Sequence, residues 1–424
     1  MDAPAPTVPA TERERLRLQL RTGYFTLEAM NGLATSFFIY YIFFFTEQQF
    51  HFTKADNLLL TSFYGFTYMA AAASAGRLAQ RLGRFRLLRM GFAGMMVSLL
   101  VGAAAPKVFG YTTVTVAIEF AVLIVWTVST STGWPTLQGL LSREASSGEY
   151  PRIVGIYNLI WAGTSGVAFL TGGSLFGFSK GGDASKLGTV FLLPVVIHIV
   201  QLVLLGRLER RAGDVDAAVS SSASVPRSQA TSGNVERATR FVRLALIANP
   251  FAYVAVYGFA PVIPQLARRF EMSDALAGVV FSVWFWSRLG AFYCFWQWPG
   301  WHYRFRWLLT AFIATIGCFF VMLLSPFVWM VVAAEFIFGL AIGLIYYSSL
   351  FYSMDAGASG TKKGGFHEAA IGLGIGAGPL VGFVALRVFP GNSNAGTWNI
   401  GGALAVGLVL FLASRLRWPR RRKT

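Results

Sequence analysis

Charged residues are scarce in this sequence of 424 residues, because Asp, Glu, Lys and Arg together supply only 13%. In a soluble domain about a quarter of the residues carry a charge. Hydrophobic residues supply 55% of the chain and include 38 Phe. A single buried core cannot hold this surplus, since soluble domains expose polar surface. The composition therefore argues against a soluble protein and favours a polytopic membrane protein.

Patterns typical of disulfide, metal and enzyme chemistry are missing as well. The two cysteines, Cys294 and Cys318, lie in apolar segments without C-x-x-C spacing, so they indicate neither a disulfide framework nor a metal site. The segment HEAAI, which begins at His367, lacks the second His of a metalloprotease motif, because Ile371 stands there. No nucleophile–base pair and no phosphate-binding loop is present. We therefore expect no enzyme activity, no cofactor and no metal.

The formal net charge of +17 comes from basic residues in short clusters between apolar runs. Few aromatic residues lie among them for base stacking, so we expect anionic membrane lipids as partners and no nucleic acid. Residues 1–21 are polar, and no small-residue cleavage site separates them from the first apolar run. We read them as a cytoplasmic N-terminal tail, not as a signal peptide.

Apolar runs long enough to cross the hydrocarbon of a bilayer, about 20 residues each, can be counted along the chain. The sequence predicts an all-α membrane protein with twelve such spans, six on each side of a long polar segment. They lie near residues 22–45, 57–80, 86–105, 112–134, 152–177, 188–207, 242–266, 275–298, 306–325, 327–352, 365–388 and 396–416.

The distribution of Lys and Arg predicts the orientation, since cytoplasmic loops are enriched in both. With the N-terminus inside, basic residues gather in the tail, in the loop after the second span, in the central polar segment and in the C-terminal RLRWPRRRK. The expected outer loops hold few, including Lys180 and Lys186, and the Arg268–Arg269 pair is the local exception. Both chain ends are therefore predicted to be cytoplasmic.

The expected organisation is two six-span bundles joined by a linker. Residues 208–241 are rich in Ser, Ala and charge and show no apolar periodicity, so we expect a flexible cytoplasmic linker. It separates an N-terminal bundle, 22–207, from a C-terminal bundle, 242–416, and a basic cytoplasmic tail follows at 417–424.

The two halves resemble each other in the fourth and tenth spans. VAIEF at 116–120 recurs as VAAEF at 332–336, and a polar, aromatic stretch follows each of them. A shared feature at a similar depth in each half is what a parallel internal repeat leaves in the sequence.

The loop between the second and third spans reads GRLAQRLGRFR, residues 76–86. It resembles the Gly-x-x-x-Asp-Arg-x-Gly-Arg-Arg signature that the major facilitator superfamily carries in this loop. Gln80 stands where the family has Asp. In the family this loop latches the cytoplasmic ends of the two halves, so the resemblance implies a cytoplasmic gate motif. Its residues here are Gly76, Gln80, Arg81, Gly83, Arg84 and Arg86.

Two glycine-rich segments are similar to packing segments of the fifth and eleventh spans in this superfamily: residues 158–173 and 372–383. Gly378–Pro379 lies in the eleventh span, whereas the fifth span, where antiporters carry a Gly-Pro motif, has no proline. We therefore do not infer antiport, and we expect the glycines to allow close helix packing.

Ionisable residues inside the apolar runs concentrate on spans that line or flank the central cavity of this superfamily. A carboxyl group shielded from water can bind a proton on one side of the membrane and release it on the other. We expect Glu119 and Glu335 to be the main proton carriers, with a protonated Glu bonded to a neighbouring backbone as the alternative. The full candidate set for proton coupling is Glu119, Glu335, Glu28, His367 and Glu368.

Other readings stay open for three of these positions and for one arginine. A carboxylate at Glu28 would also be stable near a helix N-terminus, and His367 with Glu368 would also suit an inert interface. Arg288 either pairs with a Glu, attracts an anionic substrate, or extends to the cytoplasmic face.

Polar and aromatic residues at mid-depth are the expected substrate contacts, because Trp and Tyr combine a flat apolar face with one hydrogen-bonding group. Some of them will serve packing instead. The candidates are Asn31, Trp126, Asn158, Trp161, Asn249, Tyr253, Tyr257, Arg288, Tyr346 and Tyr347.

We expect a secondary active transporter that moves a small organic solute by alternating access, coupled to protons, with symport favoured. The first alternative is a proton-coupled efflux antiporter for drugs or metabolites, and the second is a membrane receptor or scaffold that does not transport. The Gly-, Ala- and Arg-rich composition and the short loops suggest a multi-pass protein of a bacterial inner membrane, expected to be monomeric.

Overall fold

The computed structural model describes residues 10–143, 149–177, 188–219, 232–355 and 361–416. Within these ranges the regular secondary structure is entirely helical. Twelve helical segments are long and apolar enough to cross a membrane, and each coincides with a predicted span. The predicted tail 417–424 and the outer-loop residues Lys180 and Lys186 lie outside the described residues.

The N-terminal half supplies six of the spans, each as one continuous helix. Proline lies inside three of these helices without ending them, as membrane helices tolerate. The helices are α1 (Ala10–Phe50), α2 (Lys54–Leu82), α3 (Arg84–Phe109), α4 (Thr113–Arg143), α5 (Tyr150–Phe176) and α7 (Thr189–Val219).

The C-terminal half supplies the other six spans, two of which are interrupted. The first break follows from Pro261 and Pro264, which lack a backbone N–H and force a 3-10 turn between two α-helices. The elements are α8 (Ser232–Phe259), η1 (Ala260–Val262), α9 (Ile263–Arg269), α10 (Asp274–Val280), α11 (Val283–Gln297), η2 (Pro299–Trp301), α12 (Phe305–Leu324), α13 (Val328–Asp355), α14 (Thr361–Val388) and α15 (Ala395–Leu416).

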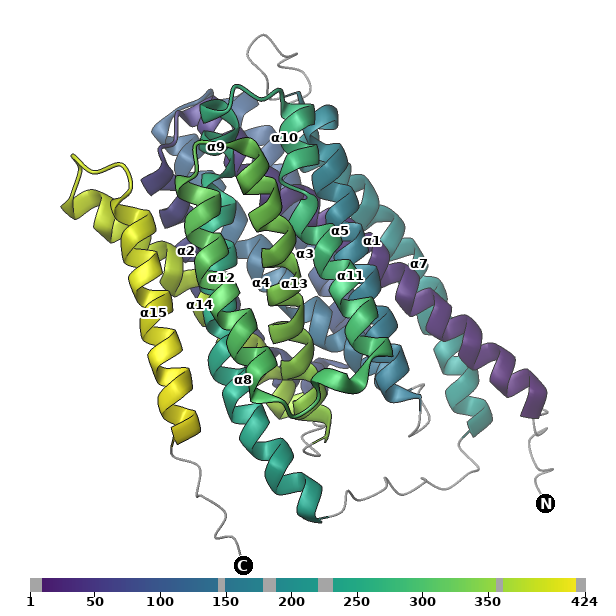
Figure 1. Cartoon of the computed structure of the whole chain (residues 1–424). Helices are drawn as coiled ribbons and strands as arrows, with labels where there is room; N and C mark the ends of the chain where they lie inside the picture. The colour runs from purple at the N-terminus through teal and green to yellow at the C-terminus, as the bar shows by residue number, and fades with distance from the viewer. Residues whose placement is uncertain (1–9, 144–148, 178–187, 220–231, 356–360, 417–424) are drawn as a thin grey trace, which may run out of the picture.

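The helices form one bundle with its two ends clearly distinguished (Figure 1). The start of α1, the end of α7, the start of α8 and the end of α15 lie at one end, whereas α9 and α10 lie at the other. Following the predicted orientation, we call the first the inner end and the second the outer end.

Several helices extend beyond the apolar runs at the inner end. α1 begins at Ala10, within the predicted tail 1–21, while α7 continues to Val219 and α8 starts at Ser232, within the predicted linker 208–241. Glu, Arg, Leu and Gln dominate ERERLRLQLR and RLERR, and these residues favour helix in water as well as in lipid. Hydropathy marks where the membrane ends, and the helix continues past that point.

The two halves meet most closely where α2 packs on α14. A methyl group added at Gly65 would overlap the backbone of Gly376, and one added at Gly372 would overlap the backbone of Met69. On the neighbouring face of α14, Gly374 and Gly378 lie against α8. The glycine-rich segment 372–383 therefore serves close packing, as the sequence predicts, because small residues let helix backbones approach in lipid.

We predict that Gly65→Val lowers the thermal unfolding temperature of the purified protein. The added side chain must push α2 away from α14, and overpacking of this kind costs about 1–3 kcal/mol. Gly402→Val is the matched control, because Gly402 is exposed on α15 and a side chain there meets no other atom. Equal unfolding temperatures for the two variants would contradict the contact.

Candidate functional site

A small cavity of about 50 Å³ lies where the two halves face each other. Both halves contribute to its wall, and aromatic side chains dominate it. The lining residues are Tyr64, Tyr68, Trp134, Gln138, Tyr157, Trp161, Tyr253, Tyr257, Tyr346, Glu368, Ile371 and Ile375.

Five helices line this central cavity with residues spaced four apart. Residues i and i+4 of a helix lie one above the other on the same face, so each pair presents two side chains to one surface. The pairs are Tyr64 and Tyr68 on α2, Trp134 and Gln138 on α4, Tyr157 and Trp161 on α5, Tyr253 and Tyr257 on α8, and Ile371 and Ile375 on α14.

Of the predicted substrate contacts, Trp161, Tyr253, Tyr257 and Tyr346 line the cavity. Sequence reasoning missed the residues of α2 and α4 altogether, and missed Tyr157 on α5. The four-residue spacing of aromatic and polar side chains on these helices is the signal that would have found them, because it repeats the spacing of Tyr253 and Tyr257.

Glu368 is the acidic residue in the cavity wall, and it bonds across the boundary between the halves. The Tyr68 hydroxyl on α2 donates a hydrogen bond of 2.7 Å to Glu368 Oε2 on α14. The preceding residue, His367, projects instead toward α13, where its Nδ1 lies 3.2 Å from the Ser349 hydroxyl. The two neighbours thus face different helices, and only Glu368 reaches the cavity.

Glu28 lies directly behind the wall of the cavity. Its side chain is fully buried, and neither carboxyl oxygen forms a hydrogen bond of ordinary geometry. Its polar neighbours include Tyr157 and Trp134, which both line the cavity. Because α1 begins at Ala10, Glu28 lies several turns inside the helix, where the helix N-terminus no longer stabilises a carboxylate.

Glu119 and Glu335 lie away from the cavity lining. Glu119 projects from α4 toward α3, where its Oε2 is close to Gly102, and Phe191 of α7 packs at the same position. Glu335 projects from α13 against the backbone of Trp284 on α11. Both side chains are buried, and their carboxyl oxygens form no hydrogen bond of ordinary geometry.

The other predicted contacts lie outside the cavity lining, and all of them except the half-buried Tyr347 are buried. Asn31 and Asn249 are almost fully buried and their side-chain amides are unpaired, whereas Asn158 donates to the carbonyl of Val154 in its own helix. Trp126 packs on Phe38 with ring centroids 4.8 Å apart. Tyr347 packs on Phe292 and Trp301 near the inner end of α13.

The predicted gate motif forms the tight turn between α2 and α3. α2 ends at Leu82 and α3 begins at Arg84, and Gly83 between them has φ of 82°, a conformation that favours glycine. Gln80, Arg81 and Arg86 are exposed, while Gly76 and Arg84 are half-buried. The role of this turn in a gate stays a prediction.

Polar contacts between the two halves gather at the outer end. Glu47 of α1 forms an ion pair with Arg268 of α9, and Asp56 of α2 forms one of 3.0 Å with Arg387 of α14. Arg269 donates to two carbonyl oxygens within the C-terminal half. The contacts of Arg268 and Arg269 explain why this pair is an exception to the predicted distribution of basic residues.

At the inner end, two ion pairs lie within the N-terminal half alone. Arg21 pairs with Glu149 at 3.2 Å, and Arg89 of α3 pairs with Glu209 of α7. Both pairs join helices of the N-terminal bundle. The two ion pairs described above that join the halves, Glu47–Arg268 and Asp56–Arg387, lie at the outer end.

The volume of the cavity also indicates a closed state. Sites that hold small organic ligands enclose about 300–1,000 Å³, several times the 50 Å³ found here. The facing helices must separate before an organic solute fits between them.

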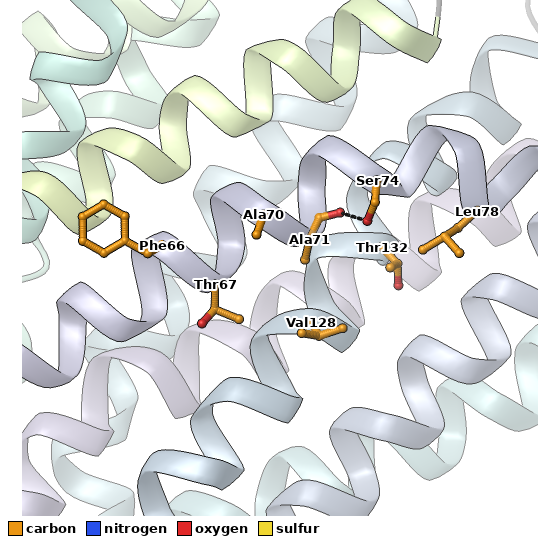
Figure 2. Close-up of a pocket in the computed structure, with 8 residues that line it drawn as sticks. All are labelled: Phe66, Thr67, Ala70, Ala71, Ser74, Leu78, Val128 and Thr132. Carbon is orange, nitrogen blue, oxygen red and sulfur yellow. Dashed lines mark hydrogen bonds between the residues drawn. The ribbon is translucent and has the colours of Figure 1, made fainter.

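A larger hollow of about 450 Å³ lies between α2 and α4 (Figure 2). It is lined mostly by apolar and small residues, and two of its polar groups bond within their own helices: Ser74 donates to Ala71 O and Thr132 to Ser129 O. Because Ala70 and Val128 are exposed on the outside of the bundle, this hollow has the character of a lipid-facing groove. It presents no charged group, so the central cavity is the better candidate site.

Comparison with known proteins agrees with this arrangement. The Major Facilitator Superfamily model matches residues 24–379. No curated protein matches the chain. The chain is similar to the solved structure of the human organic anion transporter MFSD10 (TETRAN), with 14% identity, a TM-score of 0.62, and coverage of 96% of this chain and 100% of that one. It is also similar to a D-xylose-proton symporter, with 12% identity, a TM-score of 0.65, and coverage of 95% and 99%. These likenesses confirm the predicted fold.

We predict that Glu47→Gln opens the outer end. Loss of the Arg268 ion pair removes about 1 kcal/mol from the closed state, which corresponds to about a fivefold larger open population. The measurement is the labelling rate of Tyr40→Cys by an impermeant maleimide on intact cells, in a chain whose Cys294 and Cys318 are replaced by Ser and Ala. Tyr40 is a buried residue that packs on Trp284 and Phe285.

The matched control for this experiment is Glu209→Gln. Glu209 also pairs with an arginine, but within one half and at the inner end. Its replacement should leave the labelling rate unchanged. Equal rates for both variants would show that the Glu47 pair does not hold the outer end closed.

Proposed function

Because the chain belongs to the major facilitator superfamily, we propose that it is a proton-coupled secondary transporter that moves a small organic solute by alternating access. The observation that carries this proposal is the central cavity, whose wall comes from both halves and contains a carboxyl group, that of Glu368. We place the protein in a bacterial plasma membrane, with symport as the favoured mode.

Proton coupling is supported by the surroundings of the carboxyl groups. A carboxylate buried without a cation costs several kcal/mol, so Glu28 and Glu368 are stable beside a closed cavity when they carry protons. Once the halves separate, water reaches the cavity and both groups can release their protons. Opening and proton release are thereby linked.

The structure favours Glu28 and Glu368 over Glu119 and Glu335 as the coupling residues. Glu368 contacts the cavity directly and Glu28 lies behind residues that line it. A residue that exchanges protons with the solute pathway must lie in the cavity wall or directly behind it. Glu119 and Glu335 then serve as buried neutral groups within their own halves.

Symport is favoured by two observations. The fifth span lacks the Gly-Pro motif that antiporters of this family carry, and one similar solved structure is described as a D-xylose-proton symporter. The second candidate function is efflux in exchange for protons, because a cavity of aromatic rings with one acid also suits apolar cations. A scaffold that binds a solute without moving it is the remaining alternative.

The test uses purified protein in proteoliposomes that contain a pH-sensitive dye. D-xylose, nucleosides, monocarboxylates and lipophilic cations are added in turn, with and without an imposed proton gradient. For symport we expect at least one solute to carry protons in the same direction and to accumulate when the gradient is applied. Proton movement opposite to the solute would establish exchange, and binding without any movement would favour the scaffold.

We predict that Glu28→Gln and Glu368→Gln lower accumulation about tenfold under an imposed gradient of one pH unit, because such a gradient supplies about 1.4 kcal/mol to coupled transport, while downhill exchange of the same solute continues. Gln keeps the size of the side chain and removes its ability to carry a proton. Glu119→Gln and Glu335→Gln are the matched controls, because both replace buried carboxyl groups away from the cavity lining. If only the control variants lose accumulation, the coupling residues are Glu119 and Glu335.

A further inference from the structure

Arg288 is a buried cation enclosed by aromatic rings. It lies on α11 with only 3% of its surface exposed. Its Cζ is 4.3 Å from the centre of the Trp161 ring, 4.9 Å from that of Trp284 and 5.3 Å from that of Phe285. The guanidinium group is therefore held in place within the bundle and does not extend to the cytoplasmic face.

No acidic side chain of the described residues forms an ion pair with Arg288. Its Nε and Nη2 atoms are buried and make no hydrogen bond. Cation–π contacts contribute about 0.5–2 kcal/mol each, whereas a buried ion without a counter-ion costs several kcal/mol. The positive charge is thus only partly compensated by the protein.

The two unpaired atoms of Arg288 indicate which kind of ligand would neutralise its positive charge. Nε and Nη2 form one edge of the planar guanidinium group, and this edge can donate two parallel hydrogen bonds to a carboxylate. The geometry fits a planar anion with two oxygen atoms better than it fits a single point charge.

Arg288 lies next to the central cavity. Trp161, which covers the guanidinium group, is part of the cavity wall, and so are Tyr253 and Tyr346, which also lie near Arg288. The Trp161 ring also packs on Tyr346 with centroids 5.5 Å apart. A solute in an enlarged cavity needs to displace only this aromatic layer to reach the cation.

The contact between Arg288 and Trp161 also joins the two halves, because α11 belongs to one and α5 to the other. Gly163 and Gly166 of α5 allow α11 to approach at this level, where they face Leu289 and Trp286. An anion bound to Arg288 therefore sits at a contact that must change when the halves separate.

We propose that Arg288 binds the carboxylate of an organic anion, which is the substrate of the central cavity, and that the aromatic wall holds the apolar body of that anion. This inference rests on the proposed transport function and names its substrate class.

The experiment measures ligand-induced thermal stabilisation of the purified full-length protein at pH 7. The probes are acetate, lactate, benzoate and indole-3-acetate, each compared with its own primary amide, which has nearly the same shape and no charge. We expect at least one carboxylate to raise the unfolding temperature in a saturable manner while its amide does not. A panel without any such difference, or amides that stabilise equally, would overturn the proposal.

Variants separate recognition by Arg288 from a structural role. Arg288→Gln should lower the affinity for the stabilising carboxylate at least tenfold, and Arg288→Lys should retain part of it because the charge remains. Without ligand, Arg288→Gln should unfold at the same or a higher temperature, since it removes a buried unpaired charge. Unchanged affinity in Arg288→Gln would refute the assignment.

Arg415→Gln is the matched control. Arg415 also lies over an aromatic ring, 5.6 Å from the centre of Phe305, but on the peripheral helix α15. Its replacement should leave carboxylate binding unchanged.

Failure of this inference can be told from failure of the proposed function. Carboxylate binding that depends on Arg288, without any proton-driven movement in proteoliposomes, would leave the anion site in place and remove the transport proposal. Proton-driven movement of uncharged solutes alone would support the transport proposal and rule out the anion site.

Discussion

The close contact between α2 and α14 is the constraint on which the rest of the structure depends. Lipid tails are as apolar as the side chains they touch, so helices in a membrane associate through packing more than through the hydrophobic effect. Gly65 and Gly376 let the two backbones meet. Because they meet, Tyr68 on one helix reaches Glu368 on the other. The same approach brings the aromatic rings of both halves around one cavity.

The cavity region keeps a cation and two carboxyl groups without pairing them to each other. An internal ion pair between Arg288 and Glu28 or Glu368 would neutralise both charges, yet aromatic side chains lie around the guanidinium group instead. In the proposed mechanism, each group takes an external partner: a proton neutralises a carboxyl group, and a substrate anion neutralises the arginine. Movement of an anion together with a proton transfers no net charge, which fits a site built from both kinds of group.

Hydropathy predicted all twelve spans, because length and apolar composition are properties that a membrane imposes on each helix separately. It could not predict where helices end in water, as α1 shows by starting at Ala10. The candidate site was only partly predicted. Trp161 and Tyr346 were found from residue type and depth, whereas Tyr64 and Trp134 were missed. The four-residue spacing of aromatic and polar side chains marks a candidate face on each helix, but packing with the other helices decides which face turns inward.

The paired segments VAIEF and VAAEF show this limit most clearly. Their glutamates occupy similar depths, but Glu119 faces α3, where Gly102 leaves room for it, and Glu335 faces the backbone of α11. By repeat symmetry α3 corresponds to α12 and not to α11, so the two carboxyl groups point toward non-equivalent neighbours. A sequence repeat preserves depth along the helix axis, while rotation about that axis follows the neighbouring helices. The residues that share the cavity are therefore related by contact between the halves and not by the repeat.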